Sequence, residues 1–156
     1  MSVRFQGLVV QKKAQVQFTF EGKISEDFHQ EEIIFEDNMN QVVFNLKDVS
    51  MINSCGIREW IKMTQRIDPT VEIIYEFVPP VFVNQMNLVQ GLLPENGTVS
   101  SFYAPYYDEE NDSELKVLIK SSQTVDGKAP VVKTKDGVEL EFDGIEANYF
   151  KFLKSS

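Results

Sequence analysis

The chain has 156 residues, of which 42% are hydrophobic and 12% aromatic; this excludes a disordered chain and predicts a globule with its own core. Fifteen lysines and arginines against 24 aspartates and glutamates give a net charge of −9, which argues against nucleic acid or an anionic membrane as the main partner. A single cysteine and a single histidine exclude an intramolecular disulfide and a cysteine-based zinc site, and they disfavour histidine-dependent catalysis.

The first two predicted strands differ in their hydrophobic pattern. Residues 15–20 alternate apolar and polar side chains, the period-two signature of a strand with one buried face. Residues 41–46 form a nearly continuous apolar run, which predicts a central strand covered on both faces. We expect a loop over residues 47–53, just before the next helical pattern.

A first amphipathic helix is predicted over residues 57–67. Asp68 and Pro69 end it, because proline cannot continue a helix. We expect Trp60 to anchor this helix to the sheet. The apolar side chains at helical spacing are Ile57, Trp60, Ile61, Thr64 and Ile67.

A third strand, a second helix and a fourth strand follow in order. Residues 71–78 have a strand pattern, and Pro79 and Pro80 come directly after it, at the start of a helix where proline is tolerated. Residues 98–103 form the fourth strand. This alternation predicts an α/β domain with a largely parallel sheet. The apolar stripe of the second helix consists of Phe82, Met86, Val89 and Leu93.

A change of pattern near residue 104 divides the chain into a domain of residues 1–103 and a small extension of residues 104–156. Asp143 and Glu146 form a capping-box pattern that opens a final helix. So small an extension cannot bury a core alone, so we expect it to dock on the first domain. Its predicted elements are a strand at 115–119, two short strands around Gly137, and a helix burying Ile145, Tyr149, Phe152 and Leu153.

The most informative stretch is residues 42–57 (VVFNLKDVSMINSCGI), where a buried strand leads through a short loop into a helix. Gly56 allows unusual dihedrals or a close backbone approach at this corner. The free N–H groups and the positive dipole end of the helix point at residues 53–55 and favour anionic groups there.

This stretch resembles the STAS domain of anti-sigma-factor antagonists, in which an apolar strand and an Asp-Leu-Ser-type loop lead to Asp-Ser-Ser-Gly and an amphipathic helix. The matching residues are 45–50 (NLKDVS) and 53–56 (NSCG). Residues 20–24 resemble the family's strand–Gly–Glu–Leu turn, and residues 75–92 its next strand, proline and helix. The resemblance covers about residues 14–103 and implies a STAS-like mixed, largely parallel sheet of four to five strands with helices.

The resemblance also implies a degenerate phosphoswitch. In the family, an anti-sigma-factor kinase phosphorylates the serine just before the glycine, but this position is Cys55 here, and the opening aspartate is Asn53. Ser54 remains as a candidate for phosphorylation; we favour a helix N-cap there, because serine is among the best N-caps. For Cys55 we favour a small buried residue over a reactive thiol. His29 lies in an acidic segment, and we expect it to be solvated.

The extension more faintly resembles a zinc ribbon, with residues 104–107 (APYY) before one knuckle and residues 135–137 (KDG) at another. Thiolate pairs would be needed to hold the metal, and residues 104–156 contain no cysteine. If the ancestry is real, apolar packing has to replace the metal.

Three functions compete. The leading hypothesis is a non-catalytic regulatory module that binds a protein partner, which by resemblance is an anti-sigma factor or a kinase of that kind. The alternative is a small-molecule or nucleotide-sensing STAS domain, because a helix N-terminus suits a phosphate. The least favoured is an enzyme with Cys55 as nucleophile, for which a base and an oxyanion site would be needed.

The predicted partners and location follow from the same features. We expect no cofactor, metal, nucleic acid or membrane partner, and the sequence leaves a homodimer open without fixing the oligomeric state. A cytoplasmic location is expected, because we find no signal-peptide pattern and no apolar run near the roughly 18 residues of a membrane span. The predicted interaction surface consists of Ser50, Asn53, Ser54, Cys55, Gly56, Arg58 and Glu59.

Overall fold

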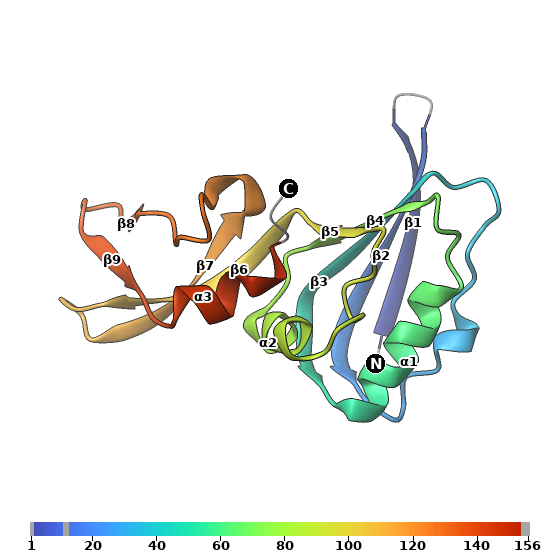
Figure 1. Cartoon of the computed structure of the whole chain (residues 1–156), viewed down its shortest axis with the longest axis horizontal. Coiled ribbons are helices and arrows are strands. Elements are labelled where there is room, and N and C mark those ends of the chain that lie inside the picture. The colour runs from blue at the N-terminus through green and yellow to red at the C-terminus, as the bar shows by residue number, and fades with distance from the viewer. Residues whose placement is uncertain (1, 11–12, 154–156) are drawn as a thin grey trace.

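The computed structural model describes residues 2–10 and 13–153, which form a mixed α/β fold on two sheets (Figure 1). Residues 1, 11, 12 and 154–156, which the two expected parts of the chain include, lie outside the described residues. Sheet A has the order β1-β2-β3-β4-β5; its last four strands are parallel and β1 is antiparallel to β2. The predicted mixed, largely parallel sheet is confirmed. Its strands are β1 (Ser2–Val10), β2 (Lys13–Ile24), β3 (Gln41–Ile52), β4 (Glu72–Glu76) and β5 (Gly97–Val99).

Two crossover helices pack on one face of sheet A. Helix α1 (Ser54–Gln65) joins β3 to β4, and α2 (Pro80–Leu88) joins β4 to β5. The ring of Trp60 lies 4.8 Å from that of Phe20 and 5.3 Å from that of Phe82, so both helices share one aromatic core. Trp60 is fully buried, which confirms its predicted role. A single 3₁₀ turn, η1 (Gln30–Glu32), lies in the connection from β2 to β3.

The opposite face of sheet A carries a layer of polar side chains. Gln41 accepts a hydrogen bond from Gln15 and donates one to Glu72 at 2.9 Å, and Gln17 reaches across β3 to Glu76 at 3.2 Å. The prediction of a central strand covered on both faces is confirmed in its position and in the burial of Val43, which lies on this second face. A continuous apolar layer covers only one face of β3, and amide and carboxylate side chains lie on the other face.

The expected loop at residues 47–53 is mostly strand. Residues 47–52 continue β3 and pair with the end of β2 through two register irregularities. The sequence obscured this because Lys47, Asp48 and Ser50 are exposed while Val49 is buried, so the apolar run stops although the strand continues.

The predicted strand at residues 98–103 is two strands in different sheets. The chain leaves sheet A after β5, and β6 (Ser101–Asp108) begins sheet B, whose order is β7-β6-β9-β8. The expected boundary between residues 103 and 104 thus falls inside β6, and we call residues 101–153 the C-terminal lobe. Its other elements are β7 (Ser113–Lys120), η2 (Ser121–Gln123), β8 (Val132–Lys133), β9 (Glu139–Phe142), α3 (Glu146–Tyr149) and η3 (Phe150–Phe152).

The final helix differs from its prediction. Helix α3 is a single turn without a side-chain cap, and Glu146 instead accepts a hydrogen bond from the backbone N–H of Ala129 at 2.6 Å. Ile145, predicted to be buried, is exposed. Phe152 is buried and lies 5.0 Å, ring to ring, from Phe102 of β6. One hydrophobic core spans both sheets, and Asn87 of α2 donates a hydrogen bond to the carbonyl oxygen of Tyr149, so the C-terminal lobe docks on the rest of the chain, as expected.

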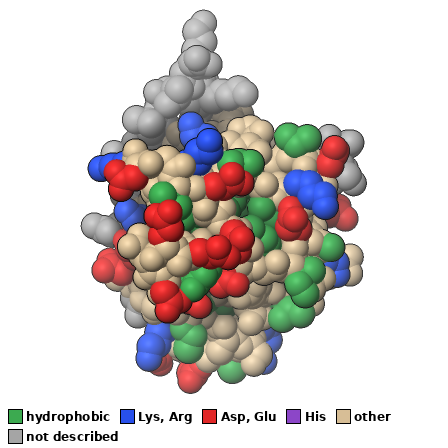
Figure 2. Space-filling model, turned by 90° about the vertical axis from the view of Figure 1, so that its left-hand side faces the viewer, with side chains coloured by type: hydrophobic (Ala, Val, Ile, Leu, Met, Phe, Trp, Pro, Cys, Tyr) green, Lys and Arg blue, Asp and Glu red, His purple; other side chains and the backbone are tan. Residues whose placement is uncertain are grey.

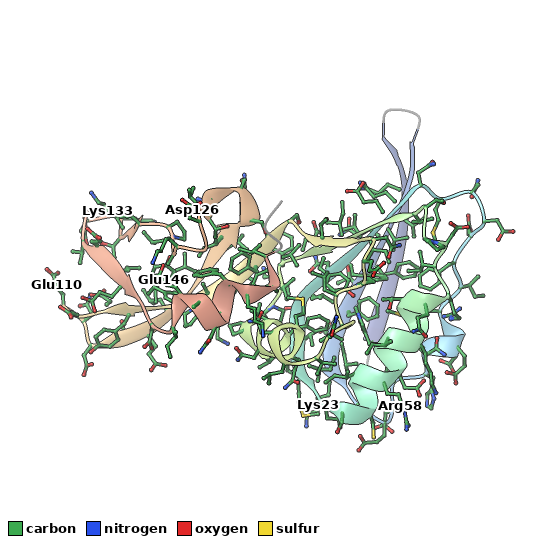
Figure 3. All side chains as sticks on the ribbon, in the orientation of Figure 1. Lys23, Arg58, Glu110, Asp126, Lys133 and Glu146 are labelled. Carbon is green, nitrogen blue, oxygen red and sulfur yellow. The ribbon has the colours of Figure 1, made fainter. Side chains whose placement is uncertain are left out.

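The far end of the C-terminal lobe is strongly acidic. Figure 2 shows carboxylates gathered on this end, and Figure 3 places Glu110 at its tip. A hydrogen bond to Asp112, together with the charges of Glu109, Asp108 and Asp143, raises the pKa of Tyr107. Within the described residues, no group of three or more His, Cys, Asp or Glu side chains is arranged to hold a metal ion.

Candidate functional site

The corner between β3 and α1 is held by Asn53. Its backbone is extended, and its side-chain Oδ1 accepts a hydrogen bond from the Gly56 N–H at 2.9 Å, which makes Asn53 the N-cap of α1. Its Nδ2 donates to Oε2 of Glu26 at 2.9 Å, and this hydrogen bond lowers the pKa of Glu26. The favoured N-cap role for Ser54 is therefore wrong, because the cap lies one residue earlier.

Gly56 is a residue of close approach. A Cβ atom at this position would lie 2.0 Å from the carbonyl oxygen of Ile24, at the end of β2. The first turn of α1 is thus pressed against the neighbouring strand, and a glycine is required for space. Gly56 is buried, so it shapes the predicted surface without contributing a side chain to it.

Ser54 and Cys55 project from this corner into solvent. Both side chains are exposed, so the expectation that Cys55 fills a buried gap is wrong. The reason is geometric: Gly56 and Ile57 face the body of the protein, and the two preceding residues of the first turn then point outward. Arg58 is also exposed and lies at the same end of the molecule as Lys23 (Figure 3).

A half-open groove of about 310 Å³ lies beside the corner. It brings together three predicted site residues, Cys55, Arg58 and Glu59, whereas Ser50 lies on β3 outside its lining. Glu59 Oε1 lies 3.9 Å from Arg58 Nε and 3.3 Å from Lys62 Nζ, so this carboxylate forms ion pairs with both side chains. The lining residues are Glu26, Phe28, His29, Glu31, Cys55, Arg58 and Glu59.

The charge of this groove is predominantly acidic. Three glutamates line it, and the cationic side chain among its lining residues is Arg58, with His29 Nδ1 lying 3.7 Å from Glu31 Oε1. These carboxylates oppose the positive potential of the helix N-terminus. The groove therefore suits a basic group better than a phosphate.

Sequence reasoning missed the half of the groove that follows β2. Phe28 and Glu31 were not assigned any role, and His29, which is exposed as expected, was assigned only to solvent. A usable signal existed, because the carboxyl ends of adjacent parallel strands meet at one edge of a sheet. Residues just after Ile24 therefore had to lie beside those just after Ile52.

Comparison of the chain with models of protein families and with curated proteins found no match. In the part of the chain that the structure describes, no helix is long and apolar enough to cross a membrane.

Proposed function

We propose that this chain is a non-catalytic regulatory module that binds a protein partner at the β3–α1 corner, in the manner of the anti-sigma-factor antagonists that its STAS-like motif resembles. The observation that carries the proposal is the position of Cys55 and Arg58, which stand exposed at a half-open groove lined by three glutamates. An accessible corner beside an acidic groove is suited to recognising a surface of complementary charge.

Recognition at this corner does not use a phosphoryl group. Cys55 occupies the position of the family's phosphorylated serine, and a phosphate there would face Glu26, Glu31 and Glu59. Like charges at such a site oppose each other. The partner instead places a lysine or arginine side chain against the groove.

The cysteine offers a direct test, because Cys55 is the single thiol of the chain and is exposed. A thiol-reactive photo-crosslinker attached there is expected to capture one protein from native lysate, identified by mass spectrometry. Capture should fail when Glu31→Lys cancels the net negative charge of the groove lining. It should also fail when the crosslinker is moved to the C-terminal lobe in a Cys55→Ser, Val131→Cys variant, since Val131 is exposed there. Equal capture from both positions would contradict the proposal.

A thermal-shift panel of nucleotides separates the proposal from a nucleotide sensor. We expect no change in the melting temperature, because the acidic lining disfavours phosphate. A ligand present at one hundred times its Kd would stabilise the fold by about 2.7 kcal/mol, which such a panel detects. Stabilisation of that size by one nucleotide would favour the sensor.

A further inference from the structure

The outer face of α2 is free of charge. Residues 77–94 contain no Asp, Glu, Lys or Arg, although a quarter of the chain is charged. Leu88 is 77% exposed and Val81 is 40% exposed, and their separation of seven residues places both on one side of the helix. Depletion of charge around exposed apolar side chains is characteristic of the central part of a protein interface.

This face borders a groove of about 880 Å³ between α2 and the C-terminal lobe. Asn87, in its lining, donates from Nδ2 to the carbonyl oxygen of Tyr149 at 2.9 Å. Ile145, 66% exposed, lines the groove together with Leu88. The lining consists of Pro80, Asn84, Asn87, Leu88, Pro105, Asp143, Gly144, Ile145, Asn148, Tyr149 and Lys151.

The groove carries one charge of each sign. Asp143 and Lys151 are its charged lining residues, and neither is in a salt bridge within the described part of the chain. Around them, Asn84 and Asn148 supply carboxamides that can both donate and accept hydrogen bonds, whereas Asn87 is bonded to Tyr149 through Nδ2 and its Oδ1 is buried. A surface with these paired properties is complementary to itself.

We propose that this face binds a second copy of the chain across a two-fold axis. Leu88 of one protomer inserts into the groove of the other, while Asp143 of each protomer faces Lys151 of its partner. Such reciprocal pairing is what a two-fold interface demands. Two molecules of charge −9 repel, and the uncharged stretch of residues 77–94 lets the two copies approach without adding like charges there.

The dimer goes beyond the proposed function and uses different residues. No residue of the α2 groove lines the groove beside Cys55. Both corner sites therefore stay accessible in the dimer, and a partner with two binding elements would gain affinity from engaging both.

Sedimentation velocity over a range of protein concentrations tests the interface. The unmodified chain is expected to sediment as a dimer, and Leu88→Lys as a monomer. Ile34→Lys is the matched control, because Ile34 is also 77% exposed and the substitution adds the same charge; it should leave the dimer intact. A monomer at every concentration, or a Leu88→Lys variant that remains dimeric, would overturn the proposal.

A charge exchange tests the geometry. Asp143→Lys and Lys151→Asp are each expected to weaken dimerisation about tenfold by placing like charges opposite each other twice per dimer. The double variant restores opposite charges and should recover most of the loss. If the double variant dimerised more weakly than either single variant, these residues would not meet across the interface.

Discussion

At the scale of single residues, Gly56 sets the position of α1 by leaving no room for a side chain. The Cβ atom of an alanine would lie 2.0 Å from the Ile24 carbonyl oxygen, which belongs to the backbone and cannot move aside cheaply. We expect Gly56→Ala to lower the free energy of unfolding by about 3 kcal/mol, as overpacked cores do. Denaturant titration measures this.

Gly91→Ala is the control for this substitution. Gly91 has a φ of +98°, and a Cβ atom there would have no neighbour within 4 Å, so an alanine adds backbone strain without a clash. Its cost should be about 1 kcal/mol. If Gly56→Ala were no worse than Gly91→Ala, the close contact between α1 and β2 would be incorrect.

The Asn53–Glu26 pair explains why an amide occupies the N-cap. Aspartate caps a helix as well as asparagine does, but here it would set a second carboxylate beside Glu26. Such a pair has raised pKa values, so stability is present at low pH and is lost as the pH rises through the carboxyl range. We expect Asn53→Asp to lower the melting temperature at pH 7. At pH 4 the melting temperature of the variant should approach that of the parent chain.

The double variant Asn53→Asp, Glu26→Gln checks the cause of that pH dependence. The introduced glutamine amide would donate to the introduced aspartate and restore one hydrogen bond without a like charge. The melting temperature of this double variant should then change with pH in the same way as that of the parent chain. A loss of stability that is the same at every pH would point to a defective cap instead.

At the scale of elements, the polar layer of sheet A holds one partly buried carboxylate. Burial raises the pKa of Glu76, which accepts a hydrogen bond from Gln17. Its ionisation therefore costs stability above its ordinary pKa of 4.5 and costs nothing well below it. We expect Glu76→Gln to raise the free energy of unfolding at pH 7, by less than about 1 kcal/mol because the side chain is partly solvated.

Thermal melts at pH 7 measure this gain, and thermal melts near pH 4 are the control. Glu76 is then largely protonated in both states, and the gain should shrink toward zero. Glu72→Gln, on the exposed edge of the same layer, should change little at either pH. A gain that persists unchanged in acid would mean that burial of charge is not its origin.

The sequence predicted the elements whose hydrophobic period is clear. Residues 57–67 lie largely within α1, and Val16, Phe18 and Phe20 line the buried face of β2. The corner itself was also predicted, because a strand followed at once by a capped, amphipathic helix leaves a local signature. Strands, helices and corners that a local residue pattern encodes could therefore be predicted from the sequence.

The remaining features depend on contacts distant in sequence. The split at Ser100 is invisible in the pattern, because both halves are strand and their residues differ only in which sheet they join. Exposure of Cys55 follows from the Ile24–Gly56 contact, across 32 residues of chain. Ile145 matched a helical stripe, yet α3 is a single turn, since Glu146 bonds to Ala129 rather than to a cap.

At the scale of the whole molecule, the two sheets share one core and should unfold together. Phe44 of β3 and Phe102 of β6 belong to one hydrophobic cluster, and a hydrogen bond from Asn87 to Tyr149 joins α2 to the C-terminal lobe. Within that lobe, Phe102 packs against Phe150 and Phe152. Phe152→Ala should cost about 3 kcal/mol, a usual value for removing a buried phenylalanine. Because Trp60 is the single tryptophan and lies in the other part of the molecule, its fluorescence reports whether that loss is transmitted.

The expected result is one transition, shifted equally in tryptophan fluorescence and in far-ultraviolet circular dichroism. Val131→Ala, an exposed position in the same lobe, should leave both curves unchanged. If Phe152→Ala altered the circular dichroism alone, the C-terminal lobe would unfold as an independent unit.

The charge of the corner groove governs the function proposed for the whole molecule, and one affinity comparison tests it most directly. With the partner captured through Cys55, isothermal titration calorimetry compares Glu31→Lys with Glu36→Lys, two exposed glutamates of one segment, of which Glu31 lines the groove. Glu31→Lys should weaken binding at least about tenfold, and Glu36→Lys should not, because only the first reverses a charge that the partner meets. Equal affinities for the two variants would contradict recognition at this corner.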